Sequence, residues 1–398
     1  FVGKLGLVNG ADAPQIFDGS TVTGMTVSGT GLTTTDLIGV IAYKSRSYFW
    51  EISSGSNPRS FWYSALGTMG GTLTEFNLGT KAGSGGYIVA AAIWSRDAGN
   101  TMDDLLAFFM STGKVLIYSG SNPGDTADWS LVGDYKTGHP LGPRCIDRLG
   151  GEVIIGTRSG YLPLSGIIQG GKFEASALSD IIRGAVKSSA AQFKDNFGWE
   201  INVSDDGGRM IVNVPASEGE TYHQHVVNLV TGAWCRFTDV PSRCWANFAG
   251  NTYFGAGGGT VKKFDTGYTD EGVNRDLTGA QAYSRLGSRG YNVQVTGIAP
   301  YIASSGALLA ALGVDVDFRN VYLPTNIYSF APAPTAWEEI ETLWEAWDEV
   351  FSDAPTAYHR WFTAKGNGGA IAPRMTMTTD DNVEWYATSI SFELGGVL

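Results

Sequence analysis

Short apolar runs separated by glycine-containing turns recur along the first two thirds of the chain. The run 105–110, Leu-Leu-Ala-Phe-Phe-Met, is followed by a turn at 111–114 and by a second run at 115–118. Glycine supplies the positive φ that tight hairpin turns need, and aromatic and β-branched residues favour strands. The pattern predicts antiparallel β-hairpins within residues 4–19, 47–64, 105–118, 152–164, 210–237 and 252–265.

The spacing of these hairpins predicts how they are arranged. They begin at intervals of very roughly 40 to 60 residues, the spacing of β-propeller blades. One hairpin cannot bury its apolar face alone, whereas a ring of sheets can. We therefore predict an all-β fold with a β-propeller-like domain of about six irregular blades over residues 1–270. A pair of β-sandwiches is the alternative. Residues 172–197, which are apolar at helical spacing, are expected to form a short helix or loop between blades four and five.

The pattern changes after residue 270. Residues 271–290 are polar and are interpreted as a linker, and 291–398 are predicted to form a smaller C-terminal antiparallel β domain. Within it, the Trp-rich segment 337–353 carries seven acidic residues and no basic one, and its apolar positions fit one helical face. It is either a solvated helix packed on the sheet or an acidic surface facing a partner or a lumen. The candidate lumen or interface residues are Glu338, Glu339, Glu341, Glu345, Asp348, Glu349, Asp380 and Asp381.

Composition narrows the classes of partner. The net charge of −12 argues against wrapping around nucleic acid, because phosphate binding needs a basic face. An acidic lumen would let DNA slide without specific binding, although the charge also serves solubility alone. No apolar stretch reaches the roughly 18 residues of a transmembrane helix, so no membrane partner is predicted. Residues 1–8 already look like a strand, and we interpret the chain as lacking an N-terminal part.

The histidines, cysteines and acidic pairs do not have the spacing of a metal-binding site. His223 and His225 share one strand face, but no third metal ligand follows from the spacing, so surface histidines are the default interpretation. Asp315 and Asp317 also share a strand face without the rest of a calcium loop. The three cysteines, Cys145, Cys235 and Cys244, are expected to be buried free thiols. We predict no metal and no cofactor.

Catalytic motifs are also missing from the pattern. There is no nucleophile elbow between a strand and a helix, and no phosphate-binding loop. A glycosidase propeller would need paired carboxylates or an arginine cluster, and neither can be assembled from the spacing. The sequence therefore predicts a protein that is not an enzyme.

Several segments resemble one family of virion proteins. They are 9–19, from Asn-Gly-Ala-Asp to Phe-Asp-Gly; 85–105, with Ala-Ala-Ala-Ile-Trp-Ser-Arg-Asp; 129–145; and 228–237, Asn-Leu-Val-Thr-Gly-Ala-Trp-Cys-Arg-Phe. Together they resemble the tail nozzle, or packaged-DNA stabilisation, proteins of short-tailed bacteriophages. The likeness extends over nearly the whole chain, and the family has no catalytic residues to carry over.

The resemblance implies a structural subunit of the phage tail. Such a subunit forms a ring with copies of itself, commonly a hexamer, below the portal and adaptor proteins. The ring extends the channel for double-stranded DNA and helps to retain or release the genome. The protein would be found in the virion, and in the host cytoplasm during assembly. The alternatives are a carbohydrate- or receptor-binding tail protein, with Trp344 or Trp347 stacking on sugars, and a glycosidase propeller.

Overall fold

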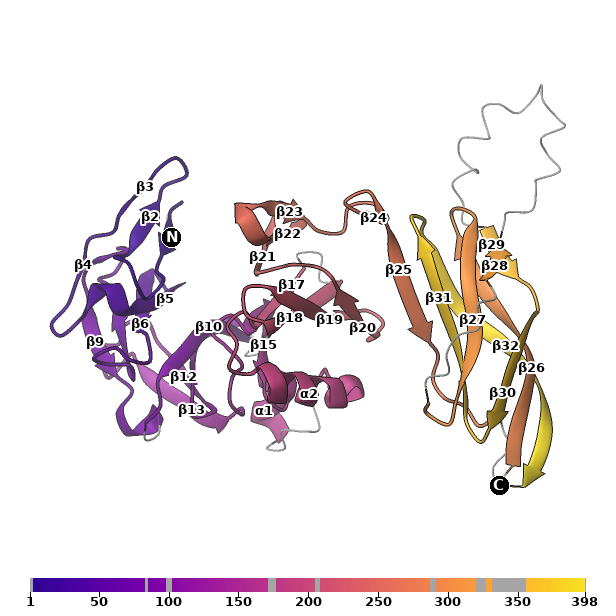
Figure 1. Ribbon diagram of the computed structural model, residues 1–398. Coiled ribbons are helices and arrows are strands. Elements are labelled where there is room, and N and C mark those ends of the chain that lie inside the picture. The colour runs from indigo at the N-terminus through magenta and orange to yellow at the C-terminus, as the bar shows by residue number, and fades with distance from the viewer. Residues whose placement is uncertain are drawn as a thin grey trace. The chain divides into compact units, whose positions relative to one another are not determined.

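The computed structural model describes residues 3–82, 85–97, 102–170, 177–204, 208–286, 291–319, 327–330 and 356–397. They form two compact units, residues 1–264 and 265–398, both built from β-sheets (Figure 1). The predicted fold class is confirmed: the protein is all-β, with a propeller-like first unit and a smaller antiparallel second unit.

The described part of the first unit contains six antiparallel sheets whose strands follow one another in chain order. The first three sheets are formed by β1 (Leu5–Leu7), β2 (Gln15–Phe17) and β3 (Val22–Gly24); by β5 (Leu37–Tyr43), β6 (Arg46–Glu51), β7 (Ser60–Tyr63) and β9 (Thr74–Asn77); and by β10 (Ile88–Asp97), β11 (Met102–Met110), β12 (Lys114–Ser119) and β13 (Ser130–Lys136).

The remaining three sheets follow in the same manner. They are formed by β14 (Ile146–Leu149), β15 (Glu152–Thr157) and β16 (Gly160–Pro163); by β17 (Glu200–Val203), β18 (Arg209–Ser217), β19 (Thr221–Asn228) and β20 (Trp234–Thr238); and by β21 (Cys244–Phe248), β22 (Asn251–Gly255) and β23 (Val261–Lys263). A short parallel pair, β4 (Val27–Ser28) with β8 (Gly71–Thr72), lies beside the first two sheets.

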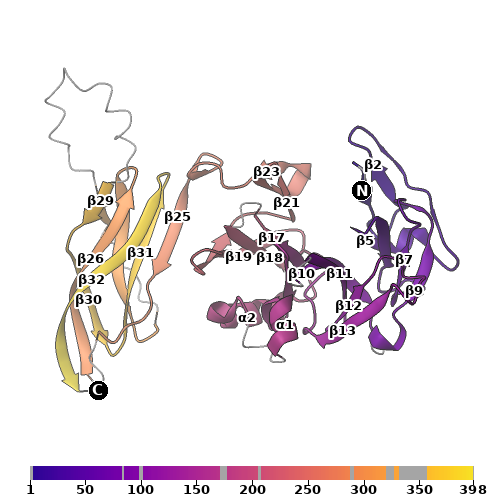
Figure 2. The ribbon, with the colours of Figure 1, turned by 180° about the vertical axis from the view of Figure 1, so that it is seen from behind.

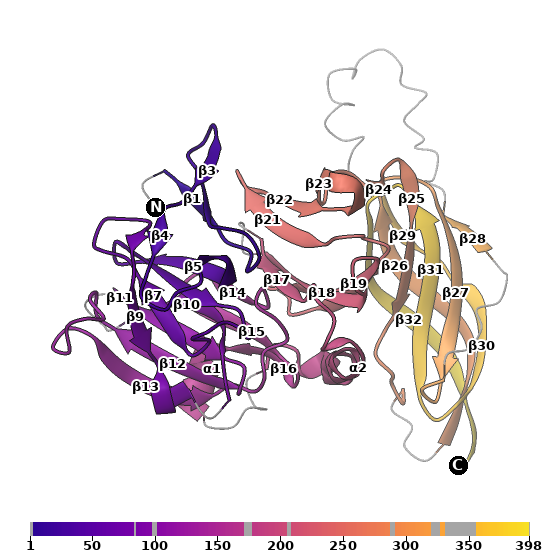
Figure 3. The ribbon, with the colours of Figure 1, turned by 60° about the vertical axis from the view of Figure 1, so that its left-hand side comes forward.

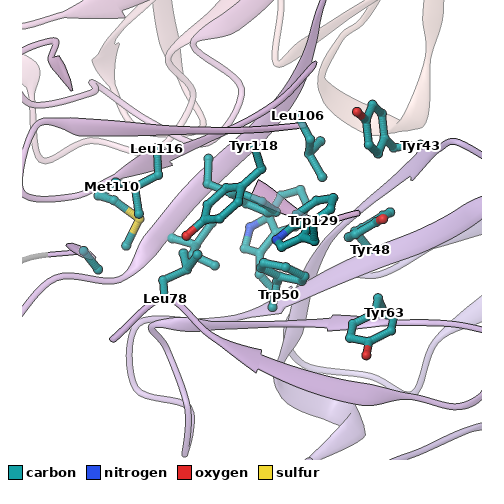
Figure 4. Packing of buried hydrophobic residues seen from close by; sticks show 14 residues of the cluster. Tyr43, Tyr48, Trp50, Tyr63, Leu78, Leu106, Met110, Leu116, Tyr118 and Trp129 are labelled. Carbon is teal, nitrogen blue, oxygen red and sulfur yellow. The ribbon is translucent and has the colours of Figure 1, made fainter. Parts of the chain in front are cut away.

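Consecutive sheets pack face to face, and each of the five junctions holds an apolar cluster. Between the second and third sheets, the ring of Phe61 stacks on Phe108 with centroids 4.6 Å apart, inside the aromatic cluster of Figure 4. The next residue along β11, Phe109, points the other way and packs with Leu162 in the junction to the fourth sheet. An internal sheet is therefore buried on both faces.

The hairpin of β11 and β12 shows how sequence determines such a sheet. All side chains from Leu105 to Met110 are almost fully buried, in keeping with their continuous apolar run. The turn places Gly113 at a φ of 79°, and a Cβ there would lie 2.8 Å from the carbonyl carbon of Gly138. Only glycine satisfies both conditions, so this position fixes the turn and hence the strand register.

The first strands of successive sheets lie side by side, namely β5 with β10, β10 with β14, β14 with β17, and β17 with β21. Two helices, α1 (Leu164–Gly170) and α2 (Arg183–Phe193), follow the fourth sheet in the chain and precede the fifth (Figure 3). Helix α1 packs on β13, β15 and β16, whereas α2 packs on β16 and β18. The prediction of a helix between these blades is confirmed by α2, whereas α1 was not predicted. Within the described ranges, no strand pairing joins the first sheet to the sixth, so the series of sheets is open.

The second unit is a sandwich of two sheets around one core (Figure 2). One sheet has the order β24 (Thr269–Asp270), β25 (Val273–Ala280), β31 (Ile371–Thr379), β27 (Leu308–Val316), β28 (Ile327–Phe330). In the other, β26 (Tyr291–Ser304) pairs with β29 (Thr356–His359) and β30 (Phe362–Gly368) on one side and with β32 (Val383–Val397) on the other.

The interpretation of 271–290 as a linker is wrong. Strand β25 occupies Val273–Ala280 and pairs with β31 along its length. Only Leu277 packs on the core, while most side chains of this strand are exposed. The strand therefore lacks the apolar run by which the other strands were recognised.

Candidate functional site

The predicted acidic surface is mostly untested. Glu338, Glu339, Glu341, Glu345, Asp348 and Glu349 lie outside the described residues. Asp380 and Asp381 lie at the turn between β31 and β32, where Asp380 is exposed and Asp381 half-buried. The Asp381 carboxylate accepts a hydrogen bond from Ser305 Oγ at 3.3 Å, and the Asp381 carbonyl accepts one from Arg275 at 3.3 Å. Asp381 thus connects its turn to β25 and to the loop between β26 and β27.

The ionisable groups of the adjacent first strands tie sheets together. Glu200 lies 3.3 Å from the Arg144 guanidinium and accepts the backbone N–H of Trp245 at 3.3 Å, so it links the fourth, fifth and sixth sheets. Burial raises the pKa of Glu200 to about 7, and Arg144 opposes that shift. Asp147 accepts the backbone N–H of Val203 at 2.7 Å. These carboxylates have structural partners.

One open cavity of about 260 Å³ lies beside these strands. Most of its lining residues are of apolar type, and the charged ones are Asp147 and Arg148. Arg148 donates a hydrogen bond to Ser95 Oγ at 3.3 Å. Ligand pockets usually enclose roughly 300–1,000 Å³ and bring several polar groups together. This cavity is smaller and open, so it does not define a substrate site.

The interpretation of His223 and His225 as surface histidines is wrong. Both are buried, at 8% and 3% exposure, because the fifth sheet is covered on both faces. His225 Nδ1 is hydrogen-bonded to the hydroxyl of Tyr161 at 2.8 Å, which joins the fifth sheet to the fourth. Burial lowers the pKa of each histidine to about 4, with Arg236 adding to the shift, so both are neutral at pH 7.

The other candidate ligands also have structural surroundings. Cys145 is buried as predicted, whereas Cys235 and Cys244 are exposed. Cys235 lies on β20, the edge strand of the fifth sheet, and Cys244 lies on the outer face of the sixth sheet. Asp315 accepts two hydrogen bonds from Arg374, at 2.8 and 2.6 Å. In the part of the chain that the structure describes, no three His, Cys, Asp or Glu side chains gather as a metal site. None of the described helices is long and apolar enough to cross a membrane.

The two ends of the stack of sheets expose apolar faces. Strand register puts Leu5, Phe17 and Val22 on one face of the first sheet, where Leu5 and Val22 are 57% and 58% exposed. On the sixth sheet, alternation puts Phe248 and Val261 on the face opposite its cluster with the fifth sheet, at 74% and 75% exposure. We call these surfaces the two end faces.

The two end faces were not predicted from the sequence. Each corresponds to a surface that the next sheet buries at the five junctions inside the stack. The available signal was the alternation of Leu5-Gly6-Leu7, which predicts two leucines on one face of a short strand. The sequence could not show that this sheet comes first in the stack.

Comparisons with known proteins identify no family. No family model matches the chain, and no curated protein matches its sequence. Raptor from Chaetomium thermophilum is 11% identical with a TM-score of 0.31, over 56% of this chain and 19% of that one. An exported protein of Bacteroides fragilis is 11% identical, with a TM-score of 0.32 over 64% and 79%. A glycoside hydrolase family 43 arabinoxylan arabinofuranohydrolase of Bacillus subtilis is 10% identical, with a TM-score of 0.27 over 91% and 95%. At such TM-scores these similarities carry no argument about function.

Proposed function

We propose that this protein is a non-enzymatic structural subunit of a bacteriophage tail, assembled with copies of itself into a ring that extends the DNA channel. The ring contains six copies, contacts adaptor or portal proteins, and lets double-stranded DNA pass without specific binding. The proposal combines the resemblance of segments such as 85–105 and 228–237 to tail nozzle proteins with one structural observation, the two end faces.

The end faces support assembly because they continue a series of buried interfaces. Five consecutive junctions in the stack bury apolar sheet faces against each other. Each buried apolar face stabilises by about 25 cal/mol per Å² removed from water. The same kind of surface at Leu5, Val22, Phe248 and Val261 is left in solvent in a single chain. In the proposed ring, neighbouring subunits cover these faces.

Electron microscopy of the purified protein and of the virion tests the proposal. The expected result is a ring with rotational symmetry and an axial channel, stacked below the portal. Monomers, or fibres projecting from the rim of the particle, would contradict it. Turnover of chromogenic glycosides by the purified protein would contradict the proposal that the protein is not an enzyme.

A second candidate function, carbohydrate binding by the second unit, is favoured by one observation. The rings of Tyr301 and His359 stack at 3.8 Å with an interplanar angle of 14°. Trp361, two residues after His359 and 53% exposed, lies against Gly297 of β26. Exposed rings on the surface of a sheet offer a stacking surface for sugars. A glycan array compares the protein with Trp361→Ala: binding lost in the variant supports this function, and no binding by either contradicts it.

A further inference from the structure

Strand β32 leaves a long sheet edge free. Its 15 residues pair with β26 from Tyr291 opposite Val397 to Ser304 opposite Val383. The other side of β26 is taken by β29 and β30. Among the described strands none pairs with the outer side of β32. An average strand has about five or six residues, so this edge is unusually long.

The edge also lacks most of the features that keep sheet edges from pairing. Natural edge strands are short, or carry proline, lysine or inward-pointing charges. Residues 383–397 contain no proline, lysine or arginine, and their charged residues are Glu384 and Glu393. Register shifts do interrupt the pairing with β26, and the indole N–H of Trp385 donates to the Ala387 carbonyl at 3.1 Å. These features cover only part of the strand.

The remaining edges of the sandwich are better protected. On the opposite edge of the same sheet, β29 and β30 are separated by Arg360 and Trp361, and the Thr363 carbonyl accepts the hydroxyl of Tyr328 at 3.1 Å. In the second sheet, β28 has four residues, and β24 covers only the start of β25. The rest of the β25 edge, Arg275–Ala280, is short and carries the charges of Arg275 and Asp276. Among the described strands of this unit, β32 therefore has the longest free edge.

Apolar side chains accompany the free edge. Tyr386 is 65% exposed, Leu394 is 64% exposed and Phe392 is 37% exposed, although Phe392 and Leu394 lie on the face that packs on the core elsewhere. An added strand would pair with the backbone groups of β32 and cover these side chains at the same time. Cross-strand aromatic and aliphatic pairs contribute roughly 0.2–1 kcal/mol each.

We propose that a second copy of this chain pairs its own β32 with this edge, antiparallel, so that one sheet continues through both copies. Two identical strands match in length, and the contact is isologous, which closes as a dimer. In a register that puts Tyr386 opposite Leu394, Glu393 faces Ala387 and the two glutamates do not oppose each other. The charges of the edge thus permit self-pairing. The inference does not rest on the proposed tail function.

The test uses the full chain and two matched leucine variants. Leu394→Lys puts a charge on the free edge, whereas Leu309→Lys changes a leucine of similar exposure, 59%, on β27, an internal strand of the other sheet. Molar mass is measured by light scattering over a concentration series. We expect Leu394→Lys to weaken the self-association of β32 by about tenfold or more, and Leu309→Lys to leave it unchanged.

Amide hydrogen exchange of residues 383–397 gives a second readout. In the wild-type protein, half of these amides are expected to gain protection as concentration rises, since alternate N–H groups point to the free edge. The inference is overturned if exchange in this segment is independent of concentration, or if assemblies persist unchanged in Leu394→Lys. It is also overturned if the protein stays monomeric at every concentration. Near-UV circular dichroism confirms that both variants are folded.

Discussion

The two units bury their strands in different ways. In the internal sheets of the first unit, both faces of a strand are buried, and residues 105–110 of β11 are all at most 4% exposed. In the second unit, strands such as β30 alternate between buried and exposed residues, because each sheet has one face on a single core. A continuous apolar run therefore marks a sheet between two others, and an alternating run marks an outer layer. The two end faces are the exception within the first unit, because the first and sixth sheets are each covered on one face only.

The largest expected effect comes from an internal sheet of the first unit. Phe108 is fully buried and stacks on Phe61, so Phe108→Ala should lower the free energy of unfolding of this unit by about 3–5 kcal/mol. Because the two units have separate cores, exchange protection in the second unit should stay the same. Amide exchange measures each unit separately, with Val22→Ala, an exposed site of the same unit, as the control. Equal loss of protection in both units would show that they do not behave as separate cores.

The second unit depends on a buried ion pair in addition to its core. Asp315 is 1% exposed and is held by two hydrogen bonds from Arg374. Removing one partner from a buried pair costs about 3–5 kcal/mol, whereas replacing both by apolar residues is often neutral. We expect Arg374→Met to destabilise this unit strongly and Asp315→Leu/Arg374→Met to recover most of the loss. Urea denaturation followed by exchange in β27 and β31 measures both, and a double variant no better than the single one would contradict this account.

An intermediate effect concerns pH and the first unit alone. The folded-state pKa values of His223 and His225 are lowered to about 4, against 6.5 when unfolded. The unfolded chain binds more protons between these values, so the histidines' contribution is complete above pH 6.5 and is lost as pH falls towards 4. Relative to His225→Gln, which removes one of the two histidines, the wild type should lose roughly 3 kcal/mol across this window.

The comparison with the histidine variant is necessary because Glu200 also changes its protonation in this pH range. Its raised pKa of about 7 favours the folded state at low pH, and this contribution is lost as pH rises from 4.5 through 7. The histidines and Glu200 thus act in opposite directions between pH 4.5 and 6.5. Denaturant unfolding of both proteins at several pH values isolates the histidine part. Parallel stability curves would contradict the burial of these side chains.

The smallest effect is geometric and tests the end faces. Cys244 is exposed on the outer side of the sixth sheet, and Val22 on that of the first. In a Val22→Cys/Cys235→Ser variant, a short bismaleimide should give crosslinks between chains at high concentration and none within a chain. Val132→Cys in place of Val22→Cys is the control at an exposed site away from the ends. An efficient crosslink within dilute monomers would mean that the stack closes on itself and leaves no faces for neighbours.

Much of the local structure could be predicted because the signals are local. The turn at 111–114 and its flanking runs match β11 and β12, since a glycine turn and two apolar strands suffice to define a hairpin. Strands of mixed polarity, such as β14 and β25, were not predicted, because their side chains are divided between polar and apolar contacts. The candidate acidic residues of 337–353 stay a prediction, because they lie outside the described residues, and Asp380 and Asp381 lie in the turn between β31 and β32.

The sequence alone determined that the protein is all-β, how its hairpins turn, and that its first part repeats a small sheet. These follow from periodicity and glycine, which act over a few residues. Only the tertiary structure decided which faces are covered. His223 and His225 are buried because other sheets lie on both sides of theirs, and Leu5 is exposed because its sheet has a neighbour on one side. Strand β32 is an edge because β26 has its other partners on the far side. Burial depends on contacts between segments distant in the chain, which no local pattern contains.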